Sequence, residues 1–507
     1  MKVFKFVLFI VIMIAAAIFY IFYTASGHAQ ISSKVSTLLS KELGQEVRLT
    51  IEDIAFTPSH IDVTFLINDA LRAEVEGFMS PLDKEYVIKY HLSGDKILFK
   101  GVNLEDKVDI SGRLQGLKDD FKLQGQGSAL DGEVDFSLHH QPKKDEDIKL
   151  SFQNLNTAKL FELLEKKPLL GGTFSLEADV SLYSEFEKRG DIKLDIHRSG
   201  VYLQNVRADY EVLLPDDFMI SSAGTIHLSP GQFTFDGRID TTAANLVLKK
   251  GRYSEANQKL NALYHLEIDE LSKLRFLTKK RYAGKFESDG ELEYLDGLRF
   301  DGESNSMDGK MSYYYEEGKL EAKLEELSME KMFRAMAYPS IMIGDISGKV
   351  EVDVHDNSAV INLRSKNLRF KRSSVIDNIY RVSSMDISRE LFQKTYFTSS
   401  VENGVVFYDF KAENRGSHIA LFDAQMDSHR NTIETNFDIK MQGEELSGEI
   451  YGSLQSPKVK LDMGKYIEFK AKKEIDEFFG MGTSDKVKKE LNNVDMDDIK
   501  GFINRFF

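Results

Sequence analysis

Most of the chain alternates apolar and polar residues with a period of two, and this pattern restricts its fold more than any other feature. The run KVEVDVHD at residues 349–356 places Val350, Val352 and Val354 on one side and charged residues or histidine on the other. The same alternation recurs at residues 174–184. Only 8 prolines occur in 507 residues, which leaves long stretches of backbone free to form sheet hydrogen bonds. The pattern predicts a mainly β, mainly antiparallel chain.

The expected β region covers residues 46–463 and is elongated and repetitive. Strand-plus-turn units of about 12 to 16 residues would give it roughly 25 to 35 strands. Such a sheet has one apolar face, which a second sheet can cover as in a sandwich. A long curved sheet can instead leave this face as an apolar groove filled by acyl chains. Alternation does not distinguish the two, because both require apolar residues on one side.

A weak internal repeat interrupts the alternating runs. Each of three segments has a short helix-like stretch, then a glycine, then an alternating strand, which is typical of arrays built from repeated units. The segments begin at Leu155, Leu271 and Leu327, and their glycines are Gly172, Gly284 and Gly344. Chance similarity among amphipathic segments is the alternative interpretation of three such loose copies.

The first 26 residues are expected to form a cytoplasmic stub and a transmembrane anchor. Lys2 and Lys5 precede an uncharged apolar run from Phe6 to Tyr23, about the minimum length of a membrane-spanning helix. Basic residues in front of the run place the N-terminus in the cytoplasm and the rest of the chain on the far side. A cleaved signal peptide, with a small-residue site around residues 27–29, is the alternative. The predicted anchor residues are Phe6, Leu8, Ile10, Ile14, Ile18 and Tyr23.

Amphipathic helices are expected at both ends of the β region. Residues 27–45 have helical apolar spacing that ends at Gly44, and residues 464–507 are rich in lysine beside an apolar stripe. The C-terminal helices would rest on a membrane, plug the end of a groove, or cover the last strands. Their apolar residues are Ile467, Phe469, Ile475, Phe478, Phe479, Phe502, Ile503 and Phe506.

Motifs that carry chemistry are almost absent from the sequence. The chain has no cysteine, which excludes disulfides, thiolate metal sites and a cysteine nucleophile. No nucleophile elbow, phosphate loop, zinc-protease motif or EF-hand occurs, and the pair His139 and His140 lacks a third ligand at a suitable spacing. The net charge of −15 argues against nucleic acid as a partner. We therefore expect no enzymatic activity, no cofactor and no metal, although the many acidic residues leave a glycan-cleaving carboxylate pair open.

Both ends of the chain resemble AsmA-like proteins. The first part reads LSKELGQEV after the apolar run, and the last part reads YGSLQSPKVKLDMGKYIEFKAKKEIDEFF. The resemblance implies a single N-terminal helix in the inner membrane and a long, curved periplasmic β-sheet with a hydrophobic groove, related to bridge-like lipid-transfer proteins. It also implies a link to phospholipid movement towards the outer membrane and to outer-membrane integrity. The chain is shorter than the largest members of the family, so a complete bridge between membranes does not follow.

The expected function is non-enzymatic lipid transfer and outer-membrane maintenance, with phospholipid acyl chains shielded in a hydrophobic β groove. The expected partners are phospholipids, the inner membrane and, as further candidates, the outer membrane or other envelope proteins. The alternative function is a scaffold, or chaperone-like factor, for outer-membrane protein assembly. The groove candidates are Val350, Val352, Val354, Ile361, Leu363, Val459 and Leu461.

Overall fold

The computed structural model describes residues 48–471, apart from short gaps at residues 58, 80–84, 100–101, 118–119, 142–145, 184–186, 338–339, 384, 428, 442, 463, 465 and 468–469. The described part is mainly β, with 26 strands and a few short helices. The strand number lies within the expected range, and the prediction of an antiparallel β chain is confirmed. The chain divides into two compact units at Leu298 and Arg299. Each unit is described by itself.

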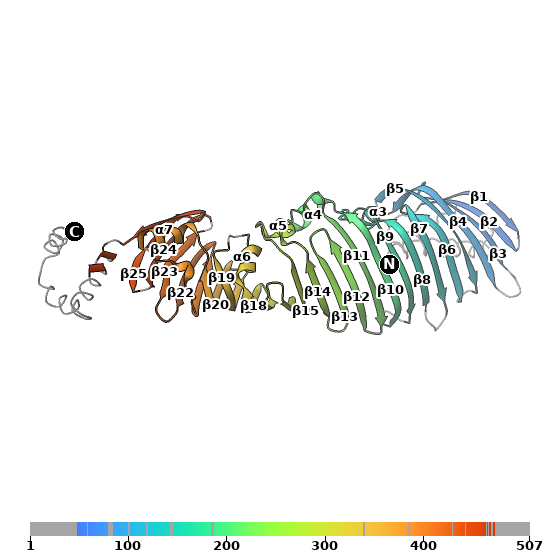
Figure 1. Ribbon diagram of the computed structural model, residues 1–507. Coiled ribbons are helices and arrows are strands. Elements are labelled where there is room, and N and C mark those ends of the chain that lie inside the picture. Colours follow the sequence, from blue (N-terminus) through green and yellow to red (C-terminus); the bar gives the residue numbers. More distant parts are fainter. Residues whose placement is uncertain are drawn as a thin grey trace. The chain divides into compact units, whose positions relative to one another are not determined.

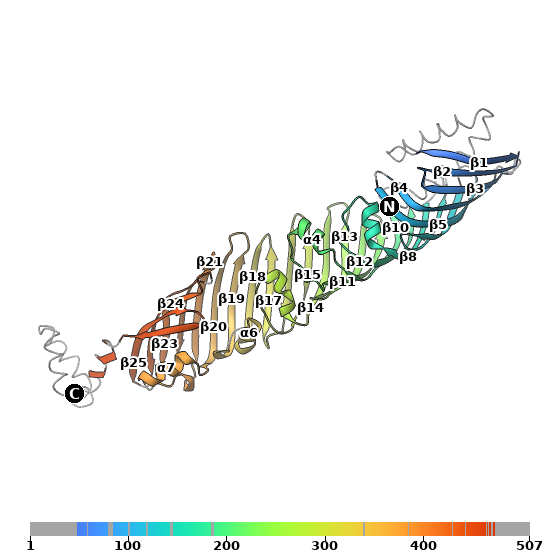
Figure 2. The same cartoon turned by 90° about the horizontal axis from the view of Figure 1, so that it is seen from above.

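The first unit contains an open, curved antiparallel sheet in which each strand pairs with the next one along the chain (Figures 1 and 2). Its strands are β1 (Leu49–Thr57), β2 (His60–Ile67), β3 (Leu71–Met79), β4 (Tyr86–Phe99), β5 (Val102–Gly116), β6 (Phe121–Ala129), β7 (Gly132–His140), β8 (Glu146–Asn156), β9 (Thr173–Leu182), β10 (Lys188–Gly200), β11 (Met219–Ser229), β12 (Gln232–Thr241), β13 (Asn245–Ser254), β14 (Lys259–Ile268) and β15 (Phe286–Tyr294). Its helices are α3 (Thr157–Leu163), α4 (Leu203–Tyr210), η1 (Leu271–Leu274) and α5 (Arg275–Thr278).

The second unit repeats this antiparallel order from β16 onward. Its strands are β16 (Leu298–Ser304), β17 (Lys310–Glu316), β18 (Lys319–Ser328), β19 (Met342–Asp353), β20 (Ser358–Phe370), β21 (Lys394–Glu402), β22 (Val405–Glu413), β23 (His418–Asp427), β24 (Thr432–Met441), β25 (Glu444–Ser453) and β26 (Ser456–Leu461). Its helices are α6 (Met329–Ala335), α7 (Ser374–Ser383) and η2 (Ile387–Arg389).

All described helices of the first unit lie along one edge of its sheet, which we call the helix edge. Helix α3 follows β8, α4 follows β10, and η1 and α5 follow β14. Even-numbered strands of an antiparallel meander all end at the same edge, so segments inserted after them gather there. Figure 1 shows α3, α4 and α5 along this edge. In the second unit, α6 and α7 likewise follow even-numbered strands, β18 and β20.

Strand register places one unbroken apolar row across the first unit. Residues paired across neighbouring strands point to the same face of a sheet. Starting from Phe65 on β2, every paired position as far as β15 is apolar or glycine. The row consists of Phe65, Ala73, Leu92, Ile110, Gly127, Val134, Phe152, Leu176, Leu194, Gly224, Gly237, Leu248, Tyr264 and Gly290.

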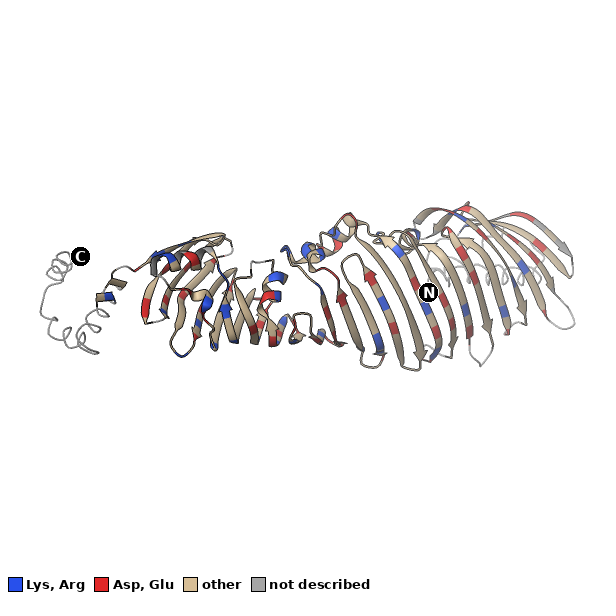
Figure 3. Ribbon diagram, in the orientation of Figure 1, with Lys and Arg blue, Asp and Glu red and all other residues tan. Residues whose placement is uncertain are grey.

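The opposite face of the same sheet is polar and rich in ion pairs between strands. The Lys149 ammonium lies 2.7 Å from the Asp179 carboxylate, and Lys193 lies 3.3 Å from Glu177. Figure 3 shows basic and acidic positions interspersed along the strands. Exposed pairs of this kind contribute at most about 1 kcal/mol each, so they mark the water-facing side more than they stabilise the sheet.

The three predicted repeat segments share one local structure. Each has a short helix, α3, η1 with α5, or α6, followed by a glycine at positive φ. Gly172 and Gly284 precede the next strand, whereas Gly344 is the third residue of β19. These φ values are 78° at Gly172, 96° at Gly284 and 146° at Gly344, which side chains disfavour. The predicted order of helix, glycine and strand is confirmed in the first two segments, and in the third segment the glycine lies inside the strand.

Two of the repeat segments also share a clamp between helix and turn. The Asn156 side chain caps α3 by accepting hydrogen bonds from the N–H groups of the second and third residues after it. Ser328 caps α6 in the same position. In the first turn of each helix, a lysine binds an aspartate from a neighbouring loop at 2.6 Å: Lys159 binds Asp131, and Lys331 binds Asp308.

Several predictions for the chain ends concern residues outside the described part. These are the anchor residues Phe6, Leu8, Ile10, Ile14, Ile18 and Tyr23, the helix at 27–45, and the C-terminal residues Phe469, Ile475, Phe478, Phe479, Phe502, Ile503 and Phe506. Of the C-terminal set, Ile467 is described and is exposed. Among the residues that the structure describes, none of the helices has the length and apolarity to span a membrane.

Candidate functional site

The apolar face of the first unit changes character along the sheet. On β2 to β5 its side chains are buried, for example Phe65 with 3% of its surface exposed and Ile110 with 2%. On β10 to β13 none of the apolar side chains is buried, and all are partly exposed. We call this second part the open apolar face and define it by Ile192, Leu194, Ile226, Phe235, Ile239 and Leu248.

In the closed part, aromatic rings fill the space above glycines. A Cβ on Gly112 or Gly125 would lie 2.2 or 2.3 Å from the Tyr90 hydroxyl oxygen, and one on Gly125 would lie 2.5 Å from the Phe136 ring. Tyr90 thus lies across β5 and β6, where its hydroxyl donates a hydrogen bond to the Gln124 carbonyl at 2.9 Å. Burial raises the pKa of this hydroxyl well above its ordinary value. Rings over glycines give this part a packed core.

In the open part, one pair of glycines has no side chain above it. Gly224 and Gly237 are opposite each other on β11 and β12. A Cβ on Gly224 would meet only backbone atoms, the nearest at 3.1 Å, and one on Gly237 would have its nearest neighbour at 3.7 Å. Phe235 does cover Gly251 on the next strand. Leu194 on β10 pairs with Gly224, and Leu248 on β13 pairs with Gly237. The open apolar face is therefore hollow between these two leucines.

In the second unit, strand register aligns predicted groove residues in one row across the sheet, although they are about a hundred positions apart in the sequence. Leu363 and Leu461 stand in one unbroken row that runs through Phe397, Phe410, Leu421, Phe437 and Gly448. Val350 pairs with Ile361 two positions along from this row, and Val459 is two positions from Leu461. Six predicted groove residues therefore share one face and are half-buried: Val350, Val352, Ile361, Leu363, Val459 and Leu461.

Two further facts qualify the predicted groove set. Val354 follows the end of β19 and has 61% of its surface exposed. Val350, Leu363, Val459 and Leu461 pack against the buried cluster around Phe437. The structure therefore places six of the seven residues on one face, whereas their contact with lipid stays a prediction.

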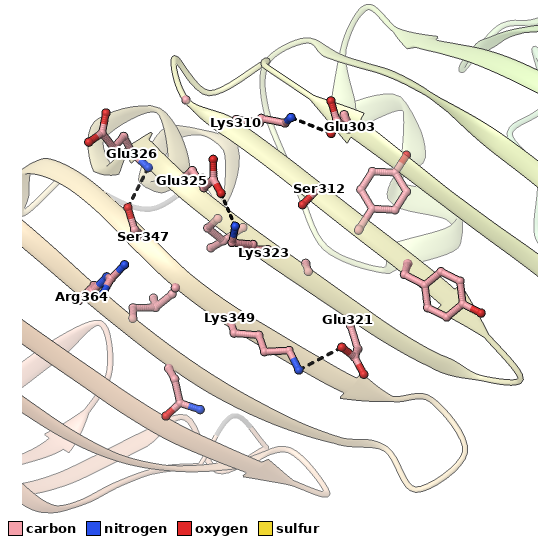
Figure 4. Close-up of a pocket in the computed structure, with 18 of the residues that line it drawn as sticks. Glu303, Lys310, Ser312, Glu321, Lys323, Glu325, Glu326, Ser347, Lys349 and Arg364 are labelled. Carbon is pink, nitrogen blue, oxygen red and sulfur yellow. Dashed lines mark hydrogen bonds and ion pairs between the residues drawn. The ribbon is translucent and has the colours of Figure 1, made fainter.

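The second unit also has a hollow of about 1280 Å³ over β16 to β21 (Figure 4). Two of its lysines bind glutamates that also line it, with Lys310 at 2.7 Å from Glu303 and Lys349 at 3.0 Å from Glu321. Lys323 pairs with Glu325 in the same way. Ion pairs of exposed groups do not form a catalytic arrangement of nucleophile and base.

One cluster has the residue types of a metal site, but a lysine already binds one of its carboxylates. His60, Asp62 and Glu76 have ligand atoms within 4.8 Å of one another on β2 and β3. The sequence does not show this cluster, because Glu76 reaches Asp62 only through strand register. Glu76 already binds the Lys89 ammonium at 3.0 Å, which supplies the positive charge that a metal would bring. The histidine pair His139 and His140 is separated in its contacts, since each binds a different carboxylate.

Comparisons with protein-family models, with curated proteins and with solved structures found no match to this chain. The resemblance of its ends to AsmA-like proteins therefore stays a prediction. The polar and apolar faces of the sheet, above all the open apolar face, are the basis for a functional proposal.

Sequence reasoning missed the open apolar face of the first unit. Its strands alternate clearly at residues 191–197 and 219–228, but the predicted groove residues were taken from other strands. Alternation shows that Ile226 and Leu194 each lie on an apolar side. It does not show which residues stand opposite each other, and only the register reveals the bare pair Gly224 and Gly237.

Proposed function

We propose that this protein is a non-enzymatic lipid carrier whose open apolar face shields phospholipid acyl chains from water. The observation that carries the proposal is the apolar row across β2 to β15, which is only half-buried from Val134 to Leu248. Apolar surface of this extent is unfavourable in water, and covering each methylene of a bound chain contributes about 0.8 kcal/mol. A flexible acyl chain suits a shallow face that continues over many strands.

A second protein layer is the competing way to cover this face. In the described part of the first unit, every strand belongs to the same sheet, and the helices lie at its edge. A sandwich would require a second sheet facing the first one. The opposite, ion-paired face would stay in water. This division of one sheet into a polar, water-facing side and an apolar side supports a carrier more than a closed core.

The resemblance to AsmA-like proteins extends the proposal to a cellular setting. A chain anchored in the inner membrane by residues 1–26 would extend its sheet into the periplasm and move phospholipid towards the outer membrane. No step of this transfer requires bond making or breaking by the protein. The absence of catalytic motifs in the sequence is consistent with that role.

Native mass spectrometry of the purified full-length protein, followed by lipid extraction, tests the proposal. The variant Ile226→Asp with Phe235→Asp puts two carboxylates on the open apolar face. Its matched control, Thr225→Asp with Thr234→Asp, puts them one residue earlier on the polar face. Bound phospholipid should fall roughly tenfold in the first variant only, since an ionised carboxylate against acyl chains costs more than the about 1.4 kcal/mol of one tenfold step.

Two results would contradict the proposal. Unaltered protein that is folded and free of lipid would show that the open face is not a lipid site. Photoreactive residues at Ile226 and Phe235 on the open apolar face that trap polypeptide instead of lipid would favour a scaffold for outer-membrane protein assembly.

A further inference from the structure

The segment between β14 and β15 is strongly basic in an acidic protein. Residues 271–284 contain five cationic side chains and no acidic one, whereas the whole chain has 66 basic and 81 acidic residues. All five are exposed, and in the described part of the chain none of them forms an ion pair. We call this group the basic segment; it consists of Lys273, Arg275, Lys279, Lys280 and Arg281.

Local hydrogen bonds hold the basic segment in place. The Glu270 carboxylate accepts hydrogen bonds from the N–H groups of Ser272 at 3.3 Å and Gly284 at 3.0 Å. The Leu271 N–H donates to the Gly284 carbonyl at 2.8 Å, which closes the loop. Lys279 adopts a positive φ of 57° at the end of α5 and turns the chain back. The cations are therefore presented by a fixed loop.

The basic segment lies on the helix edge beside the open apolar face. Its inward side chains Leu274 and Phe276 are half-buried, and the Phe276 ring centroid is 5.7 Å from that of Phe218. Phe218 directly precedes β11, so α5 reaches back along the edge towards the strands of the open apolar face. Figure 3 shows blue positions on the ribbon at this edge. Leu277 points outward among the cations with 56% of its surface exposed.

The next lysine along the chain differs from those of the basic segment. Lys285 lies 2.7 Å from Glu267 and 2.5 Å from Glu287, and these hydrogen bonds raise its pKa. Lysines on the polar face, such as Lys149 and Lys193, are paired in the same way. In the basic segment, five exposed cations lie on one short loop, and the nearby Glu270 carboxylate binds backbone N–H groups, an arrangement that a bound anion would stabilise.

We propose that the basic segment binds the phosphate-bearing headgroup of an anionic lipid whose acyl chains lie on the open apolar face. This inference rests on the proposed function and names its substrate class. Arg275 and Arg281 present forked guanidinium groups that bind phosphate oxygens in pairs, and the lysines add point charges. The exposed Leu277 supplies apolar contact where the headgroup meets the acyl chains.

A competition between two lipids measures this preference. Purified full-length protein is incubated with equal amounts of phosphatidylglycerol and phosphatidylcholine, and the bound lipids are extracted and quantified. Changing all five cations to glutamine should lower the ratio of bound phosphatidylglycerol to phosphatidylcholine roughly tenfold, because exposed cations act near the low end of their range, and five factors of about 1.6 multiply to about ten. The control variant Lys89→Gln, Lys149→Gln and Lys193→Gln on the polar face should leave the ratio unchanged. Circular dichroism confirms that both variants are folded.

The outcomes separate this inference from the proposed function. If the unaltered protein binds no lipid, the carrier proposal fails and the inference fails with it. If lipid binds without preference for the anionic one, or the preference survives in the glutamine variant, only the inference is overturned. Excess inorganic phosphate that abolishes the preference as effectively as free phosphatidylglycerol would assign the segment to phosphate alone. Cation-dependent flotation with vesicles, without any change in carried lipid, would assign it to a membrane surface.

Discussion

The strands β2 to β7 and the strands β10 to β13 share one sequence pattern but differ in what lies on their apolar face. In the first region, Tyr90 and Phe136 lie over Gly112 and Gly125, and the neighbouring side chains are buried. In the second region, the paired glycines Gly224 and Gly237 are bare and the apolar side chains are half-exposed. Alternation therefore does not determine whether a sheet face becomes a core or an open surface.

The difference lies in how large side chains and glycines are matched across strands. A ring placed opposite glycine lies flat on the sheet and covers its neighbours, which buries the face without a second layer. Two glycines opposite each other leave a hollow instead. We infer that the closed region serves stability and that the open region is the part left free for a ligand.

The largest expected effect comes from two phenylalanines that occupy equivalent positions. Phe136 covers Gly125 in the closed region, and Phe235 covers Gly251 in the open region. Phe136→Ala should lower the free energy of unfolding by about 3–5 kcal/mol, the usual result of emptying a packed site. Phe235→Ala should lower it by only about 1 kcal/mol, because the ring is half-exposed. Denaturant unfolding followed by circular dichroism measures both losses.

Bound lipid sharpens this test. Phospholipid should increase the loss caused by Phe235→Ala, since the ring then gains acyl contacts, and should not alter the loss caused by Phe136→Ala. Equal losses in the two variants without lipid would show that the open face is as well packed as the closed one. The comparison between the regions would then be wrong.

Much of the fold follows from the sequence, and the part that does not follow has a definite cause. Alternation predicted the antiparallel strands, their approximate number and the sides of Val350, Ile361 and Leu461. The bulge between Phe235 and Gly237 and the burial of Tyr90 depend on register between strands, which a single sequence does not encode locally. The metal-like cluster of His60, Asp62 and Glu76 is assembled across two strands and is hidden for the same reason.

A smaller effect is expected from filling two glycines. Gly125→Ala would force its Cβ to within 2.5 Å of the Phe136 ring, so the variant should lose about 1–3 kcal/mol of stability through overpacking. Gly237→Ala has its nearest neighbour at 3.7 Å and should be neutral or stabilising by about 0.5 kcal/mol, since alanine lowers the backbone entropy lost on folding. Thermal unfolding of the two variants decides between these outcomes. A strongly destabilised Gly237→Ala would show that the hollow is occupied by protein.

The smallest effect concerns the clamp that fastens α3 to the closed region. Lys159 binds the buried Asp106 at 2.8 Å and the exposed Asp131 at 2.6 Å. The hydrogen bond from Lys159 lowers the pKa of Asp131 below its usual value. Its carboxylate therefore contributes stability above the unfolded pKa of about 3.9, and this contribution is lost as the pH falls through the lower, folded-state pKa.

Acid titration of stability isolates this contribution. The variant Asp131→Asn removes this ion pair and leaves Lys159 bound to the buried Asp106, so its melting temperature should depend less on pH below about 4 than that of the unaltered protein. The difference should not exceed roughly 4 °C, because Asp131 is exposed and solvent screens the pair. The short helix η1 beside the open region offers a control, since Lys273→Met removes a cation that has no ion-pair partner among the described residues. A similar loss of pH dependence in both variants would show that the clamp does not distinguish the closed region from the open one.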